Sequence, residues 1–363
     1  MGVSNSASAM PSTYIHPAFT TEAGTTLHDV PIAYRTWGRL NASGTNAVIV
    51  CHALTGDTNV DDWWGALLGA GRALDPERDF ILCANVPGSP YGSVSPVTSP
   101  PETDDPYAAD FPALTPRDTV ALHRHLLNHL GVRRVRCAIG GSMGGMHVLE
   151  WAFERTEAGD PLVERIVPIA VGGQHTPWQI GWSEAQRQAI YADPKWNGGA
   201  YDPNDPPRSG LAAARAMAMV SYRSHASFQE RFGRARQSEN GTINPPFAVE
   251  SYLRYQGEKL VDRFDANCYV HLTQQMDAHD VSRDRGAYPD ALTRIEQPAL
   301  VIGIDSDVLY PLDEQEELAA HLPNADLQVL SSPHGHDAFL IELEDLNAMI
   351  TQWQDTHASA LAR

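Results

Sequence analysis

The chain has 363 residues, 42% of them hydrophobic, which supports one large domain with a real core and argues against a disordered chain. Its net charge of −19 disfavours nucleic acid and anionic membranes as partners, and no apolar run is long enough for a membrane span. Residues 1–19 show neither the basic nor the apolar segment of a secretory signal, so we expect a cytoplasmic protein. The acidic composition also fits a salt-adapted organism, and stability that rises with salt would support that hypothesis.

Short apolar runs bounded by turn residues predict strands that are buried on both faces, as in a parallel sheet. These runs lie at 47–54, 80–86, 134–141, 166–173, 298–305 and 327–332. Helical patterns lie between several of them, and the best marked has Thr115 as N-cap, Pro116 in its first turn and Gly131 at its end. The alternation predicts an α/β fold, a mostly parallel central sheet with helices on both faces.

The alternation stops between residues 174 and 297, which contain no convincing buried strand. Helical stretches at 182–190 and 211–232 flank a loop rich in Asp, Pro and Gly. We interpret residues 174–297 as a helical cap inserted into a core formed by residues 1–173 and 298–363. Such a cap would cover the carboxyl edge of the sheet, where open α/β sheets bind their ligands.

A G-x-S-x-G motif at Gly140–Gly144 places Ser142 where a predicted strand becomes a predicted helix. The motif makes a tight turn that lifts the serine hydroxyl above the sheet, beside the positive end of the helix. Close neighbours must lack side chains because the serine takes up strained backbone angles. We therefore expect Ser142 to be a nucleophile; without chemistry, the same residues would be only a glycine-rich turn.

A serine nucleophile needs a histidine base, and the base needs an orienting carboxylate. On this type of fold the chain order is serine, acid, histidine. Asp305 and Asp307 follow one late strand, and His334 and His336 follow the last one. We expect Asp307 because it lies further into its loop, and His336 because Gly335 lets the chain turn sharply before it. The set is typical of the α/β-hydrolase fold.

The oxyanion formed on attack requires backbone donors. One is expected from Met143, and the other from Leu54 or its neighbour Ala53 in the loop after an early strand. We interpret His52 as structural.

No metal site is expected, because the four cysteines lack metal-ligand spacing and the helix with His123, His125 and His129 has no accompanying carboxylate or cysteine. We expect the cysteines to be buried free thiols.

Several stretches together resemble the homoserine O-acyltransferases of methionine biosynthesis. They are residues 51–57, 88–96, 140–152, 186–201, 221–234, 249–280, 305–311 and 335–342, which span nearly the whole chain. The stretch 252–269 ("YLRYQGEKLVDRFDANCY") lies in the predicted cap, where general hydrolases differ most. It is therefore more specific evidence than the G-x-S-x-G motif.

The resemblance implies a ping-pong reaction without a cofactor, since acyl-CoA is a substrate. Ser142 would attack the thioester, the amides of Met143 and Leu54 would hold the oxyanion, and coenzyme A would leave. The side-chain hydroxyl of L-homoserine, deprotonated by His336, would then take the acyl group. The site would lie in a deep tunnel between core and cap.

The resemblance also assigns the acceptor site. Arg215 would bind the carboxylate of the amino acid, Asp337 its ammonium group, and Tyr222 and Arg223 would line the tunnel. Three structural alternatives remain open: Arg215 could pair with a surface acid, Asp337 could cap the helix that follows it, and Tyr222 and Arg223 could only pack on a cap helix.

One position departs from the family, because many relatives carry Cys where this chain has Pro90. That residue is expected near the acyl or acceptor site, so it bears on specificity. Acetyl-CoA with L-homoserine is the commonest pairing in the family; succinyl-CoA as donor and serine as acceptor occur in close relatives.

A carboxylester hydrolase and an idle binding protein are the alternative functions from other classes. By the resemblance we expect a homodimer joined through the cap helices, among them the apolar stretch 211–222.

Overall fold

The computed structural model describes residues 11–237 and 245–361. Residues 1–10, half of the stretch considered for a secretory signal, lie outside the described residues, and the rest of that stretch falls in the first strand. Within the described ranges, no helix combines the length and apolar character that a membrane crossing requires.

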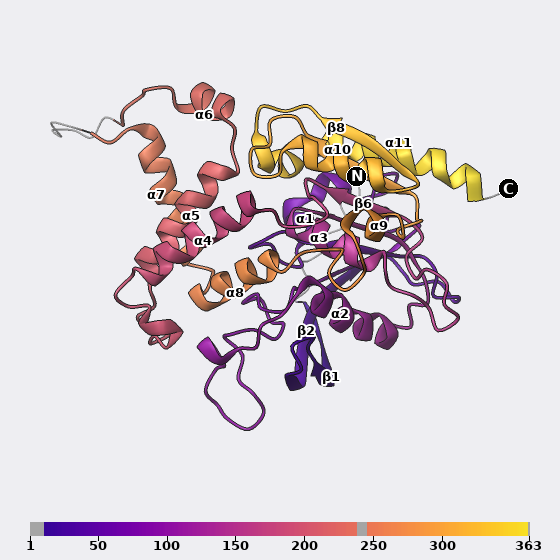
Figure 1. The fold of residues 1–363 in the computed structure, drawn as a ribbon, viewed down its shortest axis with the longest axis horizontal. Coiled ribbons are helices and arrows are strands. Elements are labelled where there is room, and N and C mark those ends of the chain that lie inside the picture. The colour runs from indigo at the N-terminus through magenta and orange to yellow at the C-terminus, as the bar shows by residue number, and fades with distance from the viewer. Residues whose placement is uncertain (1–10, 238–244, 362–363) are drawn as a thin grey trace, which may run out of the picture.

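The described residues contain one sheet of eight strands, in the spatial order β1-β2-β4-β3-β5-β6-β7-β8. Strands β3 to β8 are parallel to one another, while β2 pairs antiparallel with both β1 and β4 and so joins β1 to the sheet (Figure 1). The bounds are β1 Ser12–Thr20, β2 Thr26–Trp37, β3 Ala47–Cys51, β4 Phe80–Ala84, β5 Val135–Gly141, β6 Ile166–Ile169, β7 Ala299–Ile304 and β8 Ala325–Leu330. The predicted α/β fold with a mostly parallel sheet is confirmed.

All six apolar runs form strands, but the expectation of full burial is wrong for β8. Four of these strands are buried along their whole length and β5 at all but Arg136, whereas β8 exposes half of its residues. The reason is its place at the edge of the sheet, where it has one neighbouring strand only. Strands β1 and β2 were not predicted, because exposed side chains interrupt their apolar residues.

The helix predicted after Thr115 is present as α2, Pro116–Leu130. Thr115 and Asp118 form a capping box, and Gly131 ends the helix in the left-handed conformation at φ 80°. The other helices outside residues 170–298 are α1 Val60–Trp63, α3 Met143–Trp151, α10 Leu312–His321 and α11 Leu343–Leu361, with short 3-10 turns at Gly65–Leu67, Ala108–Asp110 and Gly335–Leu340.

Between β6 and β7 the described chain adds helices and no strand to the sheet, and we refer to these helices as the helical insertion. They are α4 Pro177–Tyr191, α5 Arg208–Ser221, α6 His225–Phe232, α7 Ala248–Val261, α8 Ala266–Asp277 and α9 Tyr288–Leu292, with a 3-10 turn at Asn197–Gly199. Helices α4 to α8 lie together on one side of the sheet (Figure 1). The helical stretch 211–232 is not continuous, because Ser224 caps a new helix, α6, after α5 has ended.

The sheet separates two hydrophobic clusters. The larger one includes α2, α3 and α8, and the smaller one contains Trp64, Phe339 and Trp353. All four cysteines are buried and unpaired, as expected. The carboxyl ends of β3, β5 and β7 carry the loops with Leu54, Ser142 and Asp307, so the sheet brings these three segments to one edge.

Candidate active site

Ser142 lies at the sharp turn between β5 and α3. Its backbone has φ 57° and ψ −125°, a strained conformation for a residue with a side chain, and its N–H donates to the carbonyl of Ile169 at 2.9 Å. The residue is only 6% exposed. The strand-turn-helix context that the G-x-S-x-G motif requires is therefore present.

The turn works only because its glycines let two backbone segments approach closely. A Cβ atom on Gly144 would overlap the carbonyl oxygen of Cys51, and one on Gly141 would lie 2.7 Å from the ring of Phe339. Helix α3 thus begins directly against the end of β3.

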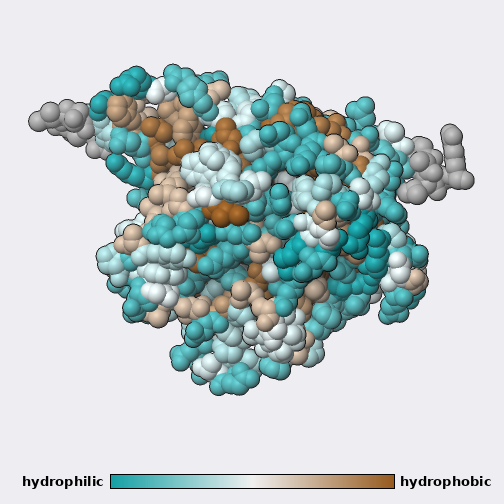
Figure 2. Space-filling view, viewed as in Figure 1, coloured by the Kyte–Doolittle hydropathy of each residue, from teal (hydrophilic) through white to brown (hydrophobic). Residues whose placement is uncertain are grey.

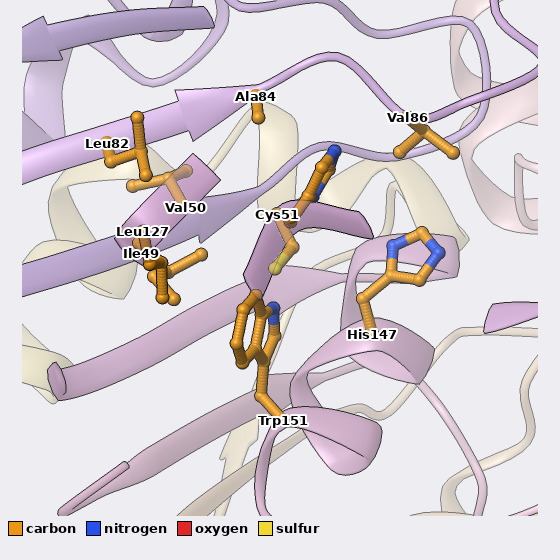
Figure 3. Close-up of a pocket in the computed structure, with 10 residues that line it drawn as sticks. Ile49, Val50, Cys51, Leu82, Ala84, Val86, Leu127, His147 and Trp151 are labelled. Carbon is orange, nitrogen blue, oxygen red and sulfur yellow. The ribbon is translucent and has the colours of Figure 1, made fainter. Parts of the chain in front are cut away.

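Behind Ser142, the buried face of α3 borders a small cavity of about 10 Å³. His147 and Trp151 project from the helix toward the strands that carry Cys51 and Ala84 (Figure 3). Neither ring nitrogen of His147 has a hydrogen-bond partner among the described residues. Burial holds the pKa of His147 well below its ordinary value, so the imidazole is neutral and packs as an apolar ring.

His336 and Asp307 meet through a short hydrogen bond. Nδ1 of His336 lies 2.6 Å from Oδ2 of Asp307, and both side chains are almost fully buried. The other carboxylate oxygen of Asp307 accepts the backbone N–H groups of Leu309 and Tyr310, which fixes the carboxylate in its loop. Nε2 of His336 is buried without a hydrogen-bond partner among the described residues, so it is available to accept a proton.

The alternative residues have other contacts. Asp305 accepts hydrogen bonds from the Ser331 hydroxyl at 2.7 Å and from the Ser332 N–H at 3.1 Å, so it fastens β7 to the end of β8. His334 lies near Ser227 and Glu342, with 32% of its side chain exposed. Within the part of the chain that the structure describes, neither forms an Asp–His contact like that of Asp307 and His336.

Three aromatic rings surround His336. Tyr310 stacks on it at 5.2 Å between centroids, Phe339 meets it edge-on at 5.5 Å, and Tyr222 lies 5.8 Å away. Burial lowers the pKa of His336, but the charge and hydrogen bond of Asp307, together with the charge of Asp337, raise it further, so the net change is upward. This is the direction that suits a general base working near neutral pH.

The two expected oxyanion donors lie where a helix and a loop begin. Met143 is the first residue of α3, so its N–H is among those that a helix leaves without an intrahelical partner. Leu54 lies in a turn closed by a hydrogen bond from the Gly56 N–H to the Ala53 carbonyl at 2.9 Å. His52 holds this loop, because it accepts the Val86 N–H and contacts the Ala53 carbonyl, as a structural histidine would.

A pocket of about 310 Å³ borders the Leu54 turn. Its lining includes Leu54, Trp63, Arg215, Arg263 and Leu340, so it joins the core to the helical insertion. The Arg215 guanidinium lies over the ring of Tyr222 at 5.5 Å, and its Nε is buried without a hydrogen-bond partner among the described residues. A guanidinium that lines a pocket and has a buried Nε without a partner is suited to a ligand carboxylate; no pairing of Arg215 with a surface acid is found within the described ranges.

Asp337 contacts Arg223, a residue that was expected only to line the tunnel. Its Oδ2 lies 3.0 Å from Nε of Arg223, and its N–H donates to the Tyr222 carbonyl at 3.1 Å. Burial raises the pKa of Asp337, while Arg223, His336 and Arg215 lower it, and the net change is upward.

Other residues at the site were not predicted. Tyr310 and Phe339 pack on His336, and Arg263 lies between the 310 Å³ pocket and a groove of about 540 Å³ that Pro90 also lines. The sequence could have indicated Tyr310, because it follows Asp307 in the same loop. Nothing in the sequence indicated Arg263 except its place in the stretch 252–269, which resembles the family. In the described ranges, no group of three or more His, Cys, Asp or Glu side chains has the arrangement of a metal site.

Comparison with known proteins identifies the family. Residues 46–343 match the family model described as the alpha/beta hydrolase fold. The chain is 67% identical to a homoserine O-acetyltransferase of Salinibacter ruber over 97% of its own length and 100% of the relative's. It is 52% identical to a homoserine O-acetyltransferase of Trichormus variabilis, over 93% of this chain and 92% of the relative.

Solved structures share the fold. A homoserine O-acetyltransferase from Bacillus anthracis superposes with a TM-score of 0.85 at 23% identity, covering 94% of this chain and 96% of that one. Esterase E22 superposes with a TM-score of 0.84 at 24% identity, covering 94% of this chain and 98% of that one. The chain is therefore an acyltransferase that belongs to the homoserine O-acetyltransferase family of the α/β-hydrolase superfamily.

Proposed function

We propose that this enzyme transfers the acetyl group of acetyl-CoA to the side-chain hydroxyl of L-homoserine, in methionine biosynthesis. The observation that carries the proposal is the 67% identity to a homoserine O-acetyltransferase over nearly the full length of both chains. The buried His336–Asp307 pair and the strained Ser142 turn supply machinery suited to acyl transfer.

In the first half-reaction, Oγ of Ser142 attacks the thioester carbon while Nε2 of His336 takes the hydroxyl proton. The Met143 and Leu54 N–H groups hold the oxyanion, the C–S bond breaks, and the proton passes from His336 to the departing thiolate. Asp307 keeps the Nδ1 proton of His336 in place and stabilises the imidazolium, a role that its 2.6 Å hydrogen bond supports.

In the second half-reaction, the homoserine hydroxyl gives its proton to Nε2 of His336 and its oxygen attacks the acyl-serine carbon. Ser142 leaves as an alkoxide and regains the proton from His336. Arg215 binds the acceptor carboxylate, Asp337 receives its ammonium group, and Tyr222 packs beside both. Burial of Ser142 and His336 limits the access of water, which competes for the acyl-enzyme.

The same proposal covers the organisation of the chain. Residues 174–297 act as a cap on a core of residues 1–173 and 298–363, and the protein works in the cytoplasm. Two copies pair through the cap helices, since Met217, Val220 and Tyr255 on α5 and α7 are exposed and apolar residues reach the surface over the helical insertion (Figure 2). No cofactor is required, because acyl-CoA is a substrate.

The test is a grid of acetyl-CoA and succinyl-CoA against L-homoserine and L-serine, read as release of the coenzyme A thiol. Release that needs acetyl-CoA and homoserine together supports the proposal, and Ser142→Ala should abolish it. Release at the same rate without an amino acid indicates a carboxylester hydrolase, and preference for another pair reassigns donor or acceptor.

A further inference from the structure

Tyr310 connects the base to the helical insertion. Its ring stacks on His336 with an interplanar angle of 27°, and its N–H donates to Asp307 at 3.0 Å. Its hydroxyl lies 3.0 Å from Nε2 of His175. Burial raises the pKa of the Tyr310 phenol well above its usual range, so the hydroxyl keeps its proton.

His175 continues the connection. Its Nδ1 lies 3.1 Å from Oδ1 of Asp277 at the end of α8, and Oδ2 of Asp277 pairs with Nη1 of Arg187 on α4 at 2.7 Å. A carboxylate only accepts hydrogen bonds, so Nδ1–H of His175 donates to Asp277 and Nε2 accepts from Tyr310. The side chains of His175 and Arg187 are 1% and 7% exposed and that of Asp277 is 18% exposed, so the contacts are largely shielded from solvent.

We propose that this buried chain, Tyr310–His175–Asp277–Arg187, positions His336 for proton transfer. The tether on the hydroxyl fixes the position of the Tyr310 ring, and that ring limits movement of the imidazole stacked on it. Because the Tyr310 N–H also holds Asp307, one tether sets the place of both the base and its orienting acid. The inference rests on the proposed role of His336 as the base.

Positioning matters because proton transfer depends steeply on geometry, so a displacement of about 1 Å costs on the order of 100-fold in rate. A purely structural alternative exists: the same hydrogen bonds would also satisfy polar groups that folding buries. The two roles differ in their effect on His336. Positioning changes the pKa and the rate together, whereas packing alone changes only the stability of the fold.

Two variants test the chain at its two ends. Tyr310→Phe keeps the stacked ring and removes the hydroxyl; Asp277→Asn keeps the shape and removes the charge that orients His175. The matched control is Tyr201→Phe, which removes a hydroxyl bonded to Asp265 at 2.6 Å elsewhere in the helical insertion. Acylation is followed as the burst of p-nitrophenol from p-nitrophenyl acetate, which requires no amino-acid acceptor, at several pH values.

We expect both variants to slow the burst about tenfold and to lower the apparent pKa of acylation, while Tyr201→Phe changes neither. The pKa of His336 should fall because a looser contact with Asp307 weakens the interaction that raises it, so that burial, which lowers it, becomes the larger effect. The other ionisable groups around His336 are Asp337 with Arg223 and Arg215, and the phenols of Tyr222 and Tyr310; these are unaltered in Asp277→Asn.

The inference is overturned if the burst rate and its pKa match those of Tyr201→Phe. It is also overturned if the rate falls without a pKa change, in proportion to a lower melting temperature. A wild-type enzyme whose acetyl-CoA turnover ignores homoserine would contradict the proposed function instead. That result leaves this test intact, because the burst involves only Ser142 and its base.

Discussion

Arg223 and Asp337 form an ion pair with 3.0 Å between Nε and Oδ2, one residue away from His336. In the proposed acceptor site, an arriving ammonium group would therefore meet a carboxylate that already has a cationic partner. The acceptor would share Asp337 with Arg223, and its own carboxylate and ammonium charges cancel, so the net charge of the site would not change when homoserine binds.

This sharing predicts a selective effect of Asp337→Asn. The change removes the charge that attracts the acceptor ammonium, so we expect the KM for homoserine to rise roughly 10- to 100-fold, the effect of one charged hydrogen bond. The burst of acyl-enzyme formation should keep most of its rate. Arg215→Ala, which removes the proposed partner of the acceptor carboxylate, should behave in the same way, and equal damage to both half-reactions would contradict these acceptor roles.

The two aspartates after β7 provide a matched pair of variants. Asp307→Asn should slow both half-reactions by about 10⁴-fold, because the amide favours the wrong tautomer of His336. Asp305→Asn should leave turnover within a few-fold and lower only the melting temperature, because Asp305 holds Ser331 and Ser332. Comparable losses of turnover in both variants would mean that the acid has been misassigned.

The pH dependence of acylation follows from the pKa of His336. The base must be neutral, and its pKa lies above the ordinary value of 6.5 because Asp307 and Asp337 outweigh burial. We expect the burst rate to rise with pH and to reach half its maximum above pH 6.5. A midpoint below that value, measured with wild-type enzyme, would show that burial dominates.

Buried histidines predict a loss of stability in mild acid. The pKa values of His123, His271 and His279 fall from 6.5 to about 4, with burial as the largest cause. The unfolded chain therefore binds protons more readily, so the stability present above pH 6.5 is lost as the pH falls toward 4. At about 1.4 kcal/mol for each pKa unit, each histidine contributes up to about 3.5 kcal/mol to this change.

Urea melts between pH 7.5 and pH 5 measure this effect. His271→Leu should flatten the dependence of unfolding free energy on pH, because it removes one of the imidazoles whose pKa is lowered. The substitution sacrifices no hydrogen bond of Nε2, which has no partner within the described residues. His28→Gln, at an exposed position on β2, serves as the control and should leave the slope unchanged. An unaltered slope in His271→Leu would assign the acid sensitivity to other groups.

The sequence predicted the strands that appear as apolar runs and missed the two strands whose apolar residues are interrupted by exposed ones. Strands β3 to β7 are buried on both faces, so each appears as an apolar run, which only Arg136 in β5 interrupts with a charged residue. Strands β1 and β2 form the antiparallel edge, where exposed polar residues such as Thr13 and Asp29 break the pattern. They pair with each other, and only β2 joins the rest of the sheet, through β4.

In the candidate site too, the sequence predicted only the residues whose order along the chain forms a pattern. Chain order and loop position favoured Asp307 and His336, because an ordered set of catalytic residues leaves a trace in sequence. The Tyr310–His175 and His175–Asp277 contacts join residues 135 and 102 positions apart, and no motif spacing predicts them. Such contacts appear only when the helical insertion is placed against the sheet.

Gly335 has φ +69°, and a Cβ atom there would lie 2.7 Å from the backbone nitrogen of Ser224. The loop that carries His336 is thus seated directly on the junction of α5 and α6, next to Tyr222 and Arg223. Residues proposed to recognise the acceptor and the residue proposed to activate it are therefore not separable modules. Exchanging the helical insertion between relatives to obtain a new acceptor would also require transplanting the 333–337 loop, because the two segments have complementary backbones.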